Sequence, residues 1–205
     1  MATRIVVIRH GQTDWNVQLR LQGHTDIALN AFGRAQAKRL ALALRDEGLV
    51  HVYSSDLGRA ADTALAFARP LALPLTLDIG LRERGFGVME GASFREIDER
   101  WPDWARRWRT REPDFEPPQG ESLLRLHERI VATAARLARA HDGACIALVT
   151  HGGVLDCLYR AATQQALDAP RTWRLDNAAI NRLLYTGPGF SLVGWGDTQH
   201  LDDMN

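Results

Sequence analysis

Two hydrophobic segments that each end at a histidine followed by glycine constrain the fold of this chain most. Residues 4–8 lead into His10, and residues 145–150 lead into His151. Such a run of β-branched and aliphatic residues, ending at a polar residue and glycine, is typical of a buried strand before a tight turn. Ligands of open α/β sheets bind just beyond the carboxyl ends of these strands. If the two strands are neighbours, both imidazoles and the Arg9 guanidinium converge on one crevice, which predicts an anion site.

Strand and helix patterns alternate along the whole chain of 205 residues. We expect helices over residues 31–46, 56–68, 121–141 and 153–162, further strands over residues 50–54, 182–186 and 191–196, and short helices over residues 94–100 and 103–109. This alternation predicts a three-layer α/β/α sandwich, with a mainly parallel sheet and helices on both faces. We expect one domain over residues 1–205, in which residues 85–118 form a small cap insertion. The polar residues 12–26 make an unusually long connection, which suggests a function.

Composition excludes several classes of protein. Lys+Arg and Asp+Glu both total 25, for a formal charge of +0, so no global field draws the chain to nucleic acid or anionic membranes. No segment approaches the roughly 20 apolar residues needed to span a bilayer, and the early first strand leaves no room for a signal peptide. Cys145 and Cys157 fit reduced core residues. We therefore expect a cytoplasmic protein with no nucleic-acid or membrane partner.

Two further segments carry charged groups suited to phosphate chemistry. Arg59 falls in the first turn of a helix that follows a strand. Helix N-termini favour anions, and a planar guanidinium binds phosphate oxygens in a bidentate manner. Glu83 lies between Arg82 and Arg84 in a glycine-punctuated loop, where it is either a catalytic carboxylate or the ion-pair partner of its neighbours. The histidines and cysteines have no spacing typical of a metal site, so we expect no metal.

These motifs together resemble the histidine phosphatase superfamily, in its phosphoglycerate-mutase-like branch. The resemblance extends over nearly the whole chain. The matching segments are Arg9-His10-Gly11-Gln12-Thr13-Asp14-Trp15-Asn16, Leu21-Gln22-Gly23, residues 54–63, Glu83 with Gly87, Glu90-Gly91, Gly120-Glu121-Ser122 and Thr150-His151-Gly152-Gly153. An ordered set of motifs with this spacing is highly specific.

The resemblance implies a metal-independent phosphomonoester hydrolase in which a ring nitrogen of His10 takes the phosphoryl group. Imidazole suits this role because its ordinary pKa of about 6.5 leaves it largely neutral at pH 7, and cationic neighbours favour the neutral form further. By the same resemblance, Arg9, Arg59 and His151 neutralise charge on the phosphoryl oxygens. Glu83 protonates the leaving oxygen and then deprotonates the attacking water or second substrate.

Substrate binding and partners also follow from the resemblance. The residues that it assigns to phosphate or substrate binding are Arg9, Asn16, Gln22, Gly23, Arg59, Arg84, His151 and Gly152. Gln22 and Thr13 have the alternative of a structural role in the loop. The expected partner is a small phosphorylated metabolite, with no cofactor unless 2,3-bisphosphoglycerate primes a mutase. The closing strands offer an edge for a homodimer.

Two alternatives to a phosphatase remain open. A phosphoglycerate mutase uses the same phosphohistidine but returns the group to another oxygen of the substrate. The short cap and the short sequence after the last expected strand favour a broad-specificity or sugar-phosphate phosphatase, whereas Arg84 and the following Phe86-Gly87 resemble the mutase loop that binds a substrate carboxylate. The second alternative is a non-catalytic module that binds a phosphorylated ligand or a partner protein.

Residues 100–111 combine three tryptophans with several arginines. Trp101, Trp104 and Trp108 recur at helical spacing, which favours a place in the core of the cap, packed against the sheet domain. Recognition of substrate anions is an alternative, and so is stacking against a nucleic acid strand or a partner.

Overall fold

The computed structural model describes residues 1–204 and is built around a six-stranded sheet with strand order β3-β2-β4-β1-β5-β6. The strands are β1 (Thr3–Arg9), β2 (Leu49–Ser54), β3 (Leu75–Leu77), β4 (Cys145–Thr150), β5 (Ile180–Thr186) and β6 (Gly189–Asp197). β1 to β4 run parallel to one another, and β5 pairs antiparallel with both of its neighbours, β1 and β6. The mainly parallel sheet expected from the sequence is confirmed.

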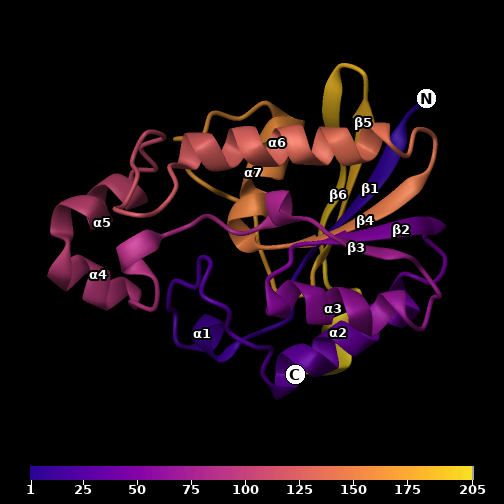
Figure 1. Ribbon diagram of the computed structural model, residues 1–205, viewed down its shortest axis with the longest axis horizontal. Coiled ribbons are helices and arrows are strands. Elements are labelled where there is room, and N and C mark those ends of the chain that lie inside the picture. Colours follow the sequence, from indigo (N-terminus) through magenta and orange to yellow (C-terminus); the bar gives the residue numbers. More distant parts are fainter. Residues whose placement is uncertain (205) are drawn as a thin grey trace.

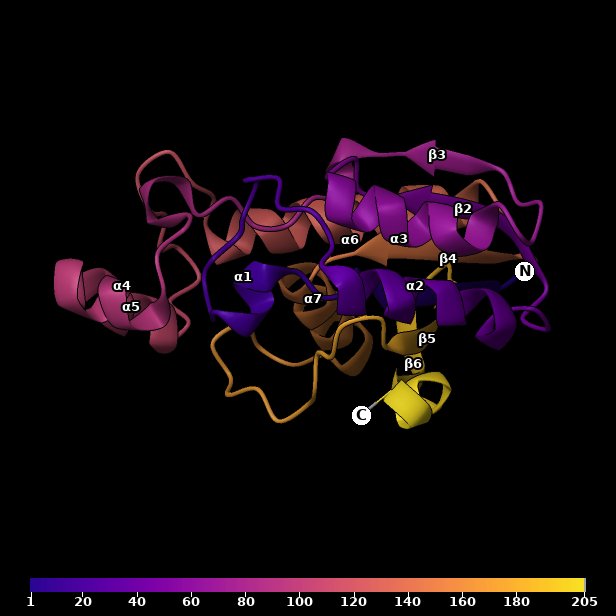
Figure 2. The same cartoon turned by 90° about the horizontal axis from the view of Figure 1, so that it is seen from below.

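Helices cover both faces of the sheet (Figures 1 and 2). The long helices are α2 (Ala31–Ala43), α3 (Gly58–Ala68), α6 (Leu123–Arg139) and α7 (Gly152–Thr163). On β1, Ile5 and Val7 belong to the core beneath α6 and α7, whereas Val6 and Ile8 belong to the core beneath α2 and α3. Side chains alternate between the faces of a strand, and both faces are buried, so the strand reads as continuously apolar. The three-layer sandwich is therefore confirmed.

Helix boundaries differ slightly from the expected ones. Asn30 caps α2 through a hydrogen bond from Gly33 N to its side chain at 2.8 Å, but α2 ends at Ala43 and the chain turns through Gly48, whose φ is +67°. α3 begins at Gly58, two residues later than expected. Asp56 precedes it and accepts a hydrogen bond from Arg82 Nε at 2.7 Å, so a tertiary contact holds this residue outside the helix.

The polar residues 12–26 contain a short helix that the sequence analysis did not predict, α1 (Asp14–Val17). The Thr13 side chain accepts from Asn16 N at 3.2 Å, and the Asn16 side chain accepts from Thr13 N at 3.0 Å. These reciprocal bonds form a capping box. A helix of four residues is too short to show a periodic pattern, which is why it was missed. Of the two roles considered for Thr13, phosphate contact and loop structure, the capping bonds show the structural one.

The cap helices α4 (Phe94–Arg100) and α5 (Pro102–Arg109) lie at one end of the molecule, on the left of Figure 1, away from the sheet. The expectation that their tryptophans belong to the core of the cap is confirmed, but the expectation that they pack against the sheet domain is wrong. They pack against a separate buried cluster of the cap and adjoining loops, which comprises Leu21, Met89, Ala92, Ile97, Ala105 and Phe115. The rings of Trp101 and Trp104 stack with their centroids 5.6 Å apart. The cap thus has its own small core because it projects beyond the sheet.

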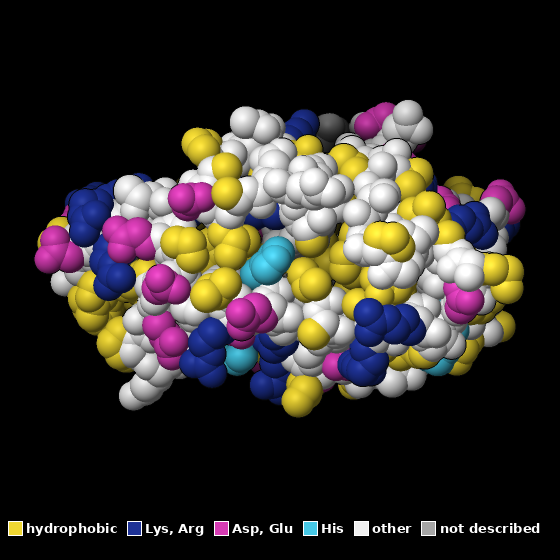
Figure 3. Space-filling model, turned by 90° about the horizontal axis from the view of Figure 1, so that it is seen from above, with side chains coloured by type: hydrophobic (Ala, Val, Ile, Leu, Met, Phe, Trp, Pro, Cys, Tyr) yellow, Lys and Arg dark blue, Asp and Glu magenta, His cyan; other side chains and the backbone are white. Residues whose placement is uncertain are grey.

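Figure 3 shows the face that α6 covers, with acidic and basic side chains interspersed over the cap end. Both cysteines are free and buried. Among residues 1–204, no helix combines the length and the apolar character that a membrane crossing requires. β6 is an edge strand of the sheet, and the homodimer expected from the closing strands stays a prediction.

Candidate active site

The register of the sheet brings the two histidines together. β1 and β4 are adjacent and parallel, with Arg9 paired to Thr150, so His10 and His151 leave the sheet at the same edge. Their ring centroids are 5.2 Å apart, and both residues are buried. The two strands are therefore neighbours, as the convergence of both imidazoles on one crevice requires.

The hydrogen bond of the His10 ring identifies its free nitrogen. Nδ1 lies 2.7 Å from the carbonyl oxygen of Gly11. A carbonyl only accepts hydrogen bonds, so Nδ1 carries the proton and Nε2 of the neutral ring has the free lone pair. His10 lines a cavity of about 760 Å³. Its Nε2 is therefore the nitrogen suited to attack an electrophile bound there.

Buried hydrogen-bonding groups surround this nitrogen. Arg59, in the first turn of α3, is fully buried and donates from Nη1 to Thr25 O at 3.0 Å and from Nη2 to Gly23 O at 2.8 Å. Arg9 donates from Nη1 to Leu175 O. Within the described chain, the Nε atoms of Arg9 and Arg59 and both ring nitrogens of His151 are buried without a hydrogen-bond partner. Buried polar groups are usually paired, so the two guanidinium Nε–H groups and the single N–H of the neutral His151 ring fit the oxygens of a bound anion.

The same surroundings keep both histidines neutral. Burial, followed by the charges of Arg59 and Arg9, lowers the pKa of His10 well below its ordinary value. Burial and then Arg59 do the same to the pKa of His151. Burial also lowers the pKa of Arg84, to about 10, which leaves this arginine cationic at neutral pH. The site thus combines permanent cations with an unprotonated imidazole.

These lowered pKa values predict that the protein loses stability as the pH falls below about 6.5. In the unfolded chain both histidines take up protons near their ordinary pKa of about 6.5, whereas the native rings stay neutral to lower pH. The unfolded state then binds more protons, so the free energy of unfolding falls by up to about 1.4 kcal/mol per pH unit for each histidine. Urea unfolding at pH 7.5, 6.5 and 5.5 measures this slope.

The variant His10→Asn removes one histidine and keeps the carboxylates that also titrate in acid. The difference in pH dependence between the variant and the wild type therefore gives the contribution of His10. The unfolding free energy of the variant should fall less steeply below pH 6.5 than that of the wild type. Equal slopes for the two proteins would contradict the lowered pKa of His10.

The carboxylate of Glu83 is held by main-chain amides. Gly153 N, in the first turn of α7, donates to Glu83 Oε2 at 3.0 Å, and Arg84 N donates to Oε1 at 2.8 Å. The side chain of Arg82 pairs with Asp56 instead. The side chain of Arg84 donates to the carbonyls of Glu121 and Phe115. The alternative in which Glu83 only pairs with its neighbouring arginines is therefore not what the structure shows.

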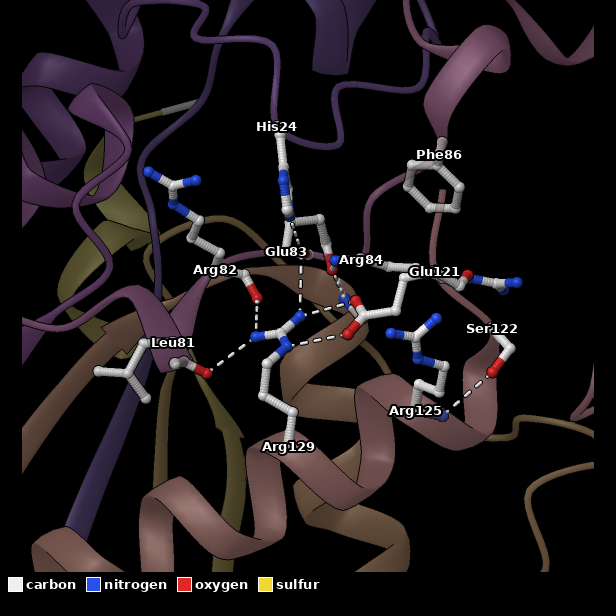
Figure 4. Close-up of polar contacts among 12 residues, drawn as sticks. His24, Leu81, Arg82, Glu83, Arg84, Phe86, Glu121, Ser122, Arg125 and Arg129 are labelled. Carbon is white, nitrogen blue, oxygen red and sulfur yellow. Dashed lines mark hydrogen bonds and ion pairs between the residues drawn. The ribbon is translucent and has the colours of Figure 1, made fainter. Parts of the chain in front are cut away.

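An arginine of α6 fixes the backbone that carries Glu83 (Figure 4). Arg129 donates to Gly80 O at 2.8 Å, to Arg82 O at 3.0 Å and to Glu83 O at 3.3 Å. Glu121 accepts from Nε and Nη2 of the same guanidinium at 2.9 and 2.7 Å. His24 Nε2 contacts Glu83 O at 2.8 Å from the other side. Through Arg129, Glu121 of the Gly-Glu-Ser motif therefore helps to hold the loop that carries Glu83, although that loop lies nearly forty residues earlier in the sequence.

The close approach of Glu83 to Gly153 gives a sharp prediction for Gly153→Ala. A Cβ at this position would lie 2.3 Å from Glu83 Oε1, so the carboxylate must move away. Only the end of a flexible side chain is displaced, and we expect the fold to remain stable. General acid–base catalysis is worth about 10²–10⁴-fold. For the phosphatase that the sequence motifs imply, hydrolysis of alkyl phosphates should therefore fall by roughly 10²-fold or more, and that of activated aryl phosphates by less, because an aryl leaving group needs less protonation.

Gly85→Ala is the matched control for this substitution. Its added Cβ would approach nothing closer than 3.7 Å, at His24. Steady-state rates for the two variants on both ester types make the comparison. An equal loss for alkyl and aryl phosphates in Gly153→Ala would argue against Glu83 as the acid.

A cavity of about 760 Å³ opens between this edge of the sheet and the cap. The expected site residues that line it are Arg9, His10, Asn16, Gln22, Gly23, Arg59, Glu83, Arg84 and Gly152. His151 does not line the cavity but is buried beside His10. Gln22 Oε1 is buried without a partner among the described residues, whereas the Oδ1 of Asn16 is occupied by Thr13 and by Asn177, which leaves the Asn16 amide nitrogen as its donor.

Sequence reasoning missed part of the cavity wall. The unexpected lining residues include Trp15, Phe86, Phe94, Asp156, Arg171 and Asn177. Trp108 and Arg111 also line the cavity and belong to residues 100–111, for which recognition of substrate anions was one of the alternatives. Asn177 donates to His10 O at 2.9 Å from the loop before β5, which has no periodic pattern that could have revealed it. Asp156 follows Gly152 by four residues on one helix, and this spacing was a usable signal. Among residues 1–204, no group of three or more His, Cys, Asp or Glu side chains is placed to hold a metal ion.

The chain is similar over nearly its whole length to proteins of one family. Residues 5–198 match the sequence profile of the histidine phosphatase superfamily (branch 1), and the chain belongs to this family. It is 37% identical over 203 residues to the phosphoglycerate mutase-like protein 4 of Arabidopsis thaliana, an alignment that covers 97% of this chain and 87% of that protein. The recognition of the family from its motifs is confirmed.

Solved structures agree with this assignment. YhfR of Bacillus stearothermophilus superposes with a TM-score of 0.90 at 30% identity, and the superposition covers 98% of this chain and 100% of YhfR. A mycobacterial glucosyl-3-phosphoglycerate phosphatase superposes with a TM-score of 0.84 at 30% identity, covering 95% of this chain and 99% of that one. The relatives thus include a named phosphatase and a phosphoglycerate mutase-like protein.

Proposed function

We propose that this chain is a phosphomonoester hydrolase that acts without a metal ion, through a phosphohistidine intermediate on His10. The observation that supports this most is the free Nε2 of a neutral, buried His10 beside the unpaired nitrogens of Arg9, Arg59 and His151. A nucleophile at the centre of fixed cations and donors suits phosphoryl transfer, in which positioning and charge neutralisation supply most of the catalysis.

The first half-reaction moves the phosphoryl group to the enzyme. Nε2 of His10 attacks phosphorus as the bond to the leaving oxygen breaks, and the carboxyl proton of Glu83 passes to that oxygen. Arg9 and Arg59 neutralise the nonbridging oxygens, with further hydrogen bonds from Asn16 and the Gly152 amide. The alcohol leaves with one proton gained.

The second half-reaction restores the enzyme. The Glu83 carboxylate takes a proton from water, and the water oxygen attacks phosphorus as the phosphorus–nitrogen bond breaks. Inorganic phosphate departs, His10 is neutral again and Glu83 carries its proton. The proposed cycle needs no organic cofactor, and its substrate is a small phosphorylated metabolite.

A phosphoglycerate mutase is the second candidate, and the cationic groups of the cavity favour it. Arg84 and Arg171 line the cavity in addition to the arginines beside His10, which is more positive charge than one phosphate requires. A phosphoglycerate also carries a carboxylate. The Arabidopsis relative is named for its likeness to such mutases.

A phosphorus NMR time course separates the two candidates. The protein is incubated in EDTA with 3-phosphoglycerate and a trace of 2,3-bisphosphoglycerate, and in parallel with 4-nitrophenyl phosphate. We expect free phosphate to grow in the presence of EDTA with at least the aryl ester. Growth of 2-phosphoglycerate would make the protein a mutase, and complete loss of activity in EDTA would contradict the metal-free cycle.

A further inference from the structure

A polar cluster on the cavity wall lies apart from the reacting groups. Asp156 is on α7 and lines the same cavity as His10. It follows Gly152 by four residues, so the two share a helix face about 6 Å apart along the helix axis. A substrate whose phosphate lies at Gly152 would extend its leaving group along this face. Asp156 is thus placed to contact the part of the substrate that differs from one phosphomonoester to another.

The two oxygens of Asp156 have unequal surroundings. Oδ2 accepts from Arg160 Nε at 3.1 Å and from Arg111 Nη2. The side chain is only 5% exposed, and its Oδ1 is buried and has no hydrogen-bond partner within the described chain. A buried carboxylate oxygen without a partner is costly, by more than about 1–3 kcal/mol. It accepts only from an O–H or N–H group, which is what a ligand in the cavity can present.

Arg111 supplies a cation beside this oxygen from the cap. It follows α5 with a φ of 57°, in the left-handed region where glycine is usual after a helix. An arginine there is strained by roughly 1–3 kcal/mol, which is maintained only where the surrounding structure holds it. The holding contacts are the pair with Asp156 and a hydrogen bond from Arg111 Nε to Leu167 O at 2.8 Å. These contacts place the guanidinium at the cavity wall.

The geometry points to a leaving-group subsite, made by Asp156 and Arg111, that selects phosphomonoesters of hydroxylated alcohols such as polyols and sugars. A hydroxyl donates to Asp156 Oδ1 and accepts from Arg111 at the same time. A substrate carboxylate at this point is repelled by the negative charge of Asp156, and a substrate ammonium group is repelled by the positive charge of Arg111. This inference rests on the proposed hydrolase activity.

The test compares two alkyl esters that differ only in hydroxyl groups, sn-glycerol 3-phosphate and propyl phosphate. A hydrogen bond to a charged group discriminates by about 10-fold or more. The wild-type kcat/KM should therefore favour glycerol phosphate by about that ratio. A wild-type ratio near one would overturn the subsite, and so would hydrolysis of 4-nitrophenyl phosphate with neither alkyl ester accepted.

Asp156→Asn keeps the volume but removes the acceptor. Two arginines donate at the Oδ2 position, so the amide oxygen takes that position and the NH₂ group takes the position of Oδ1. The preference for glycerol phosphate should fall to within about threefold of unity. Asp114→Asn, at an exposed aspartate of the cap loop with the same change of charge, should retain the wild-type preference. A preference that persists in Asp156→Asn would contradict the proposal.

A second variant covers the case in which Asp156→Asn does not fold. Arg111→Gln leaves the pair of Asp156 with Arg160 intact and removes the cationic donor. It should lower the preference for glycerol phosphate as well, and an unchanged ratio would contradict the subsite. Absence of hydrolysis of all three esters by the wild type would instead contradict the proposed hydrolase function, on which the subsite depends.

Discussion

Replacing His10 with asparagine is expected to abolish turnover of every phosphomonoester while the protein remains folded. The nucleophile is lost, and removal of a nucleophile in comparable covalent mechanisms lowers kcat on the order of 10⁴–10⁶-fold. The His10 ring is neutral in the native state, and among the described residues its one hydrogen bond is to Gly11 O, which the shorter amide can replace in part. Stability at neutral pH should therefore change little. Steady-state kinetics and thermal unfolding measure the two effects separately.

Phosphate binding distinguishes loss of the nucleophile from loss of the site. Arg9, Arg59 and His151 remain in the variant, so inorganic phosphate should still raise the melting temperature. His51→Asn provides a matched control, because His51 contacts Thr76 on β3, outside the cavity. If His10→Asn retained turnover within tenfold of the wild type, His10 would not be the nucleophile.

Arg59→Met is expected to impair both catalysis and the electrostatics of His10. An arginine that neutralises a transferring phosphoryl group is worth about 10³–10⁵-fold in kcat. Arg59 is also the second cause, after burial, of the lowered pKa of His10. Its removal should raise the pKa of His10 toward the ordinary value, which an NMR titration of the imidazole ring measures. Because the carbonyls of Gly23 and Thr25 lose their partners, we also expect a loss of stability of roughly 1–3 kcal/mol.

Two further variants make this result specific. Arg59→Lys keeps the charge but not the planar fork of the guanidinium. It should therefore restore most of the lowering of the His10 pKa, but only part of the catalytic rate. Arg69→Met removes an exposed arginine just after the same helix and should leave rate and pKa unchanged. A pKa of His10 that does not move in Arg59→Met would contradict the electrostatic account.

Much of the fold was predictable because its signals are local. The strands β1 and β4 are continuously apolar and buried on both faces, and the apolar stripe of α6 marks the side that packs on the sheet. The short helix α1 was missed, because four residues give no period. The cap tryptophans were correctly expected in the core of the cap, but not what they pack against, since their spacing shows which face is buried and not what covers it.

The candidate reacting groups and the proposed leaving-group subsite also differ in how far local sequence signals reveal them. His10, Arg59, Glu83 and His151 were identified before the structure because each stands at the end of a strand, at the start of a helix or in a glycine-rich loop. Their proposed roles await the variants described above. Asp156 and Arg111 lie 45 residues apart and form an ion pair only when the cap folds over α7, so no local pattern could have joined them.

The sequence by itself determined the alternation of elements, the family and the set of candidate reacting residues, because periodicity and motif spacing are properties of the chain alone. Only the tertiary structure decided which ring nitrogen of His10 is free, why the pKa values of both histidines are lowered, and what the cavity wall presents to a leaving group. These properties depend on burial and on contacts between segments that are distant in sequence. Hydrogen bonding and electrostatic interactions act through space, and the fold sets those distances.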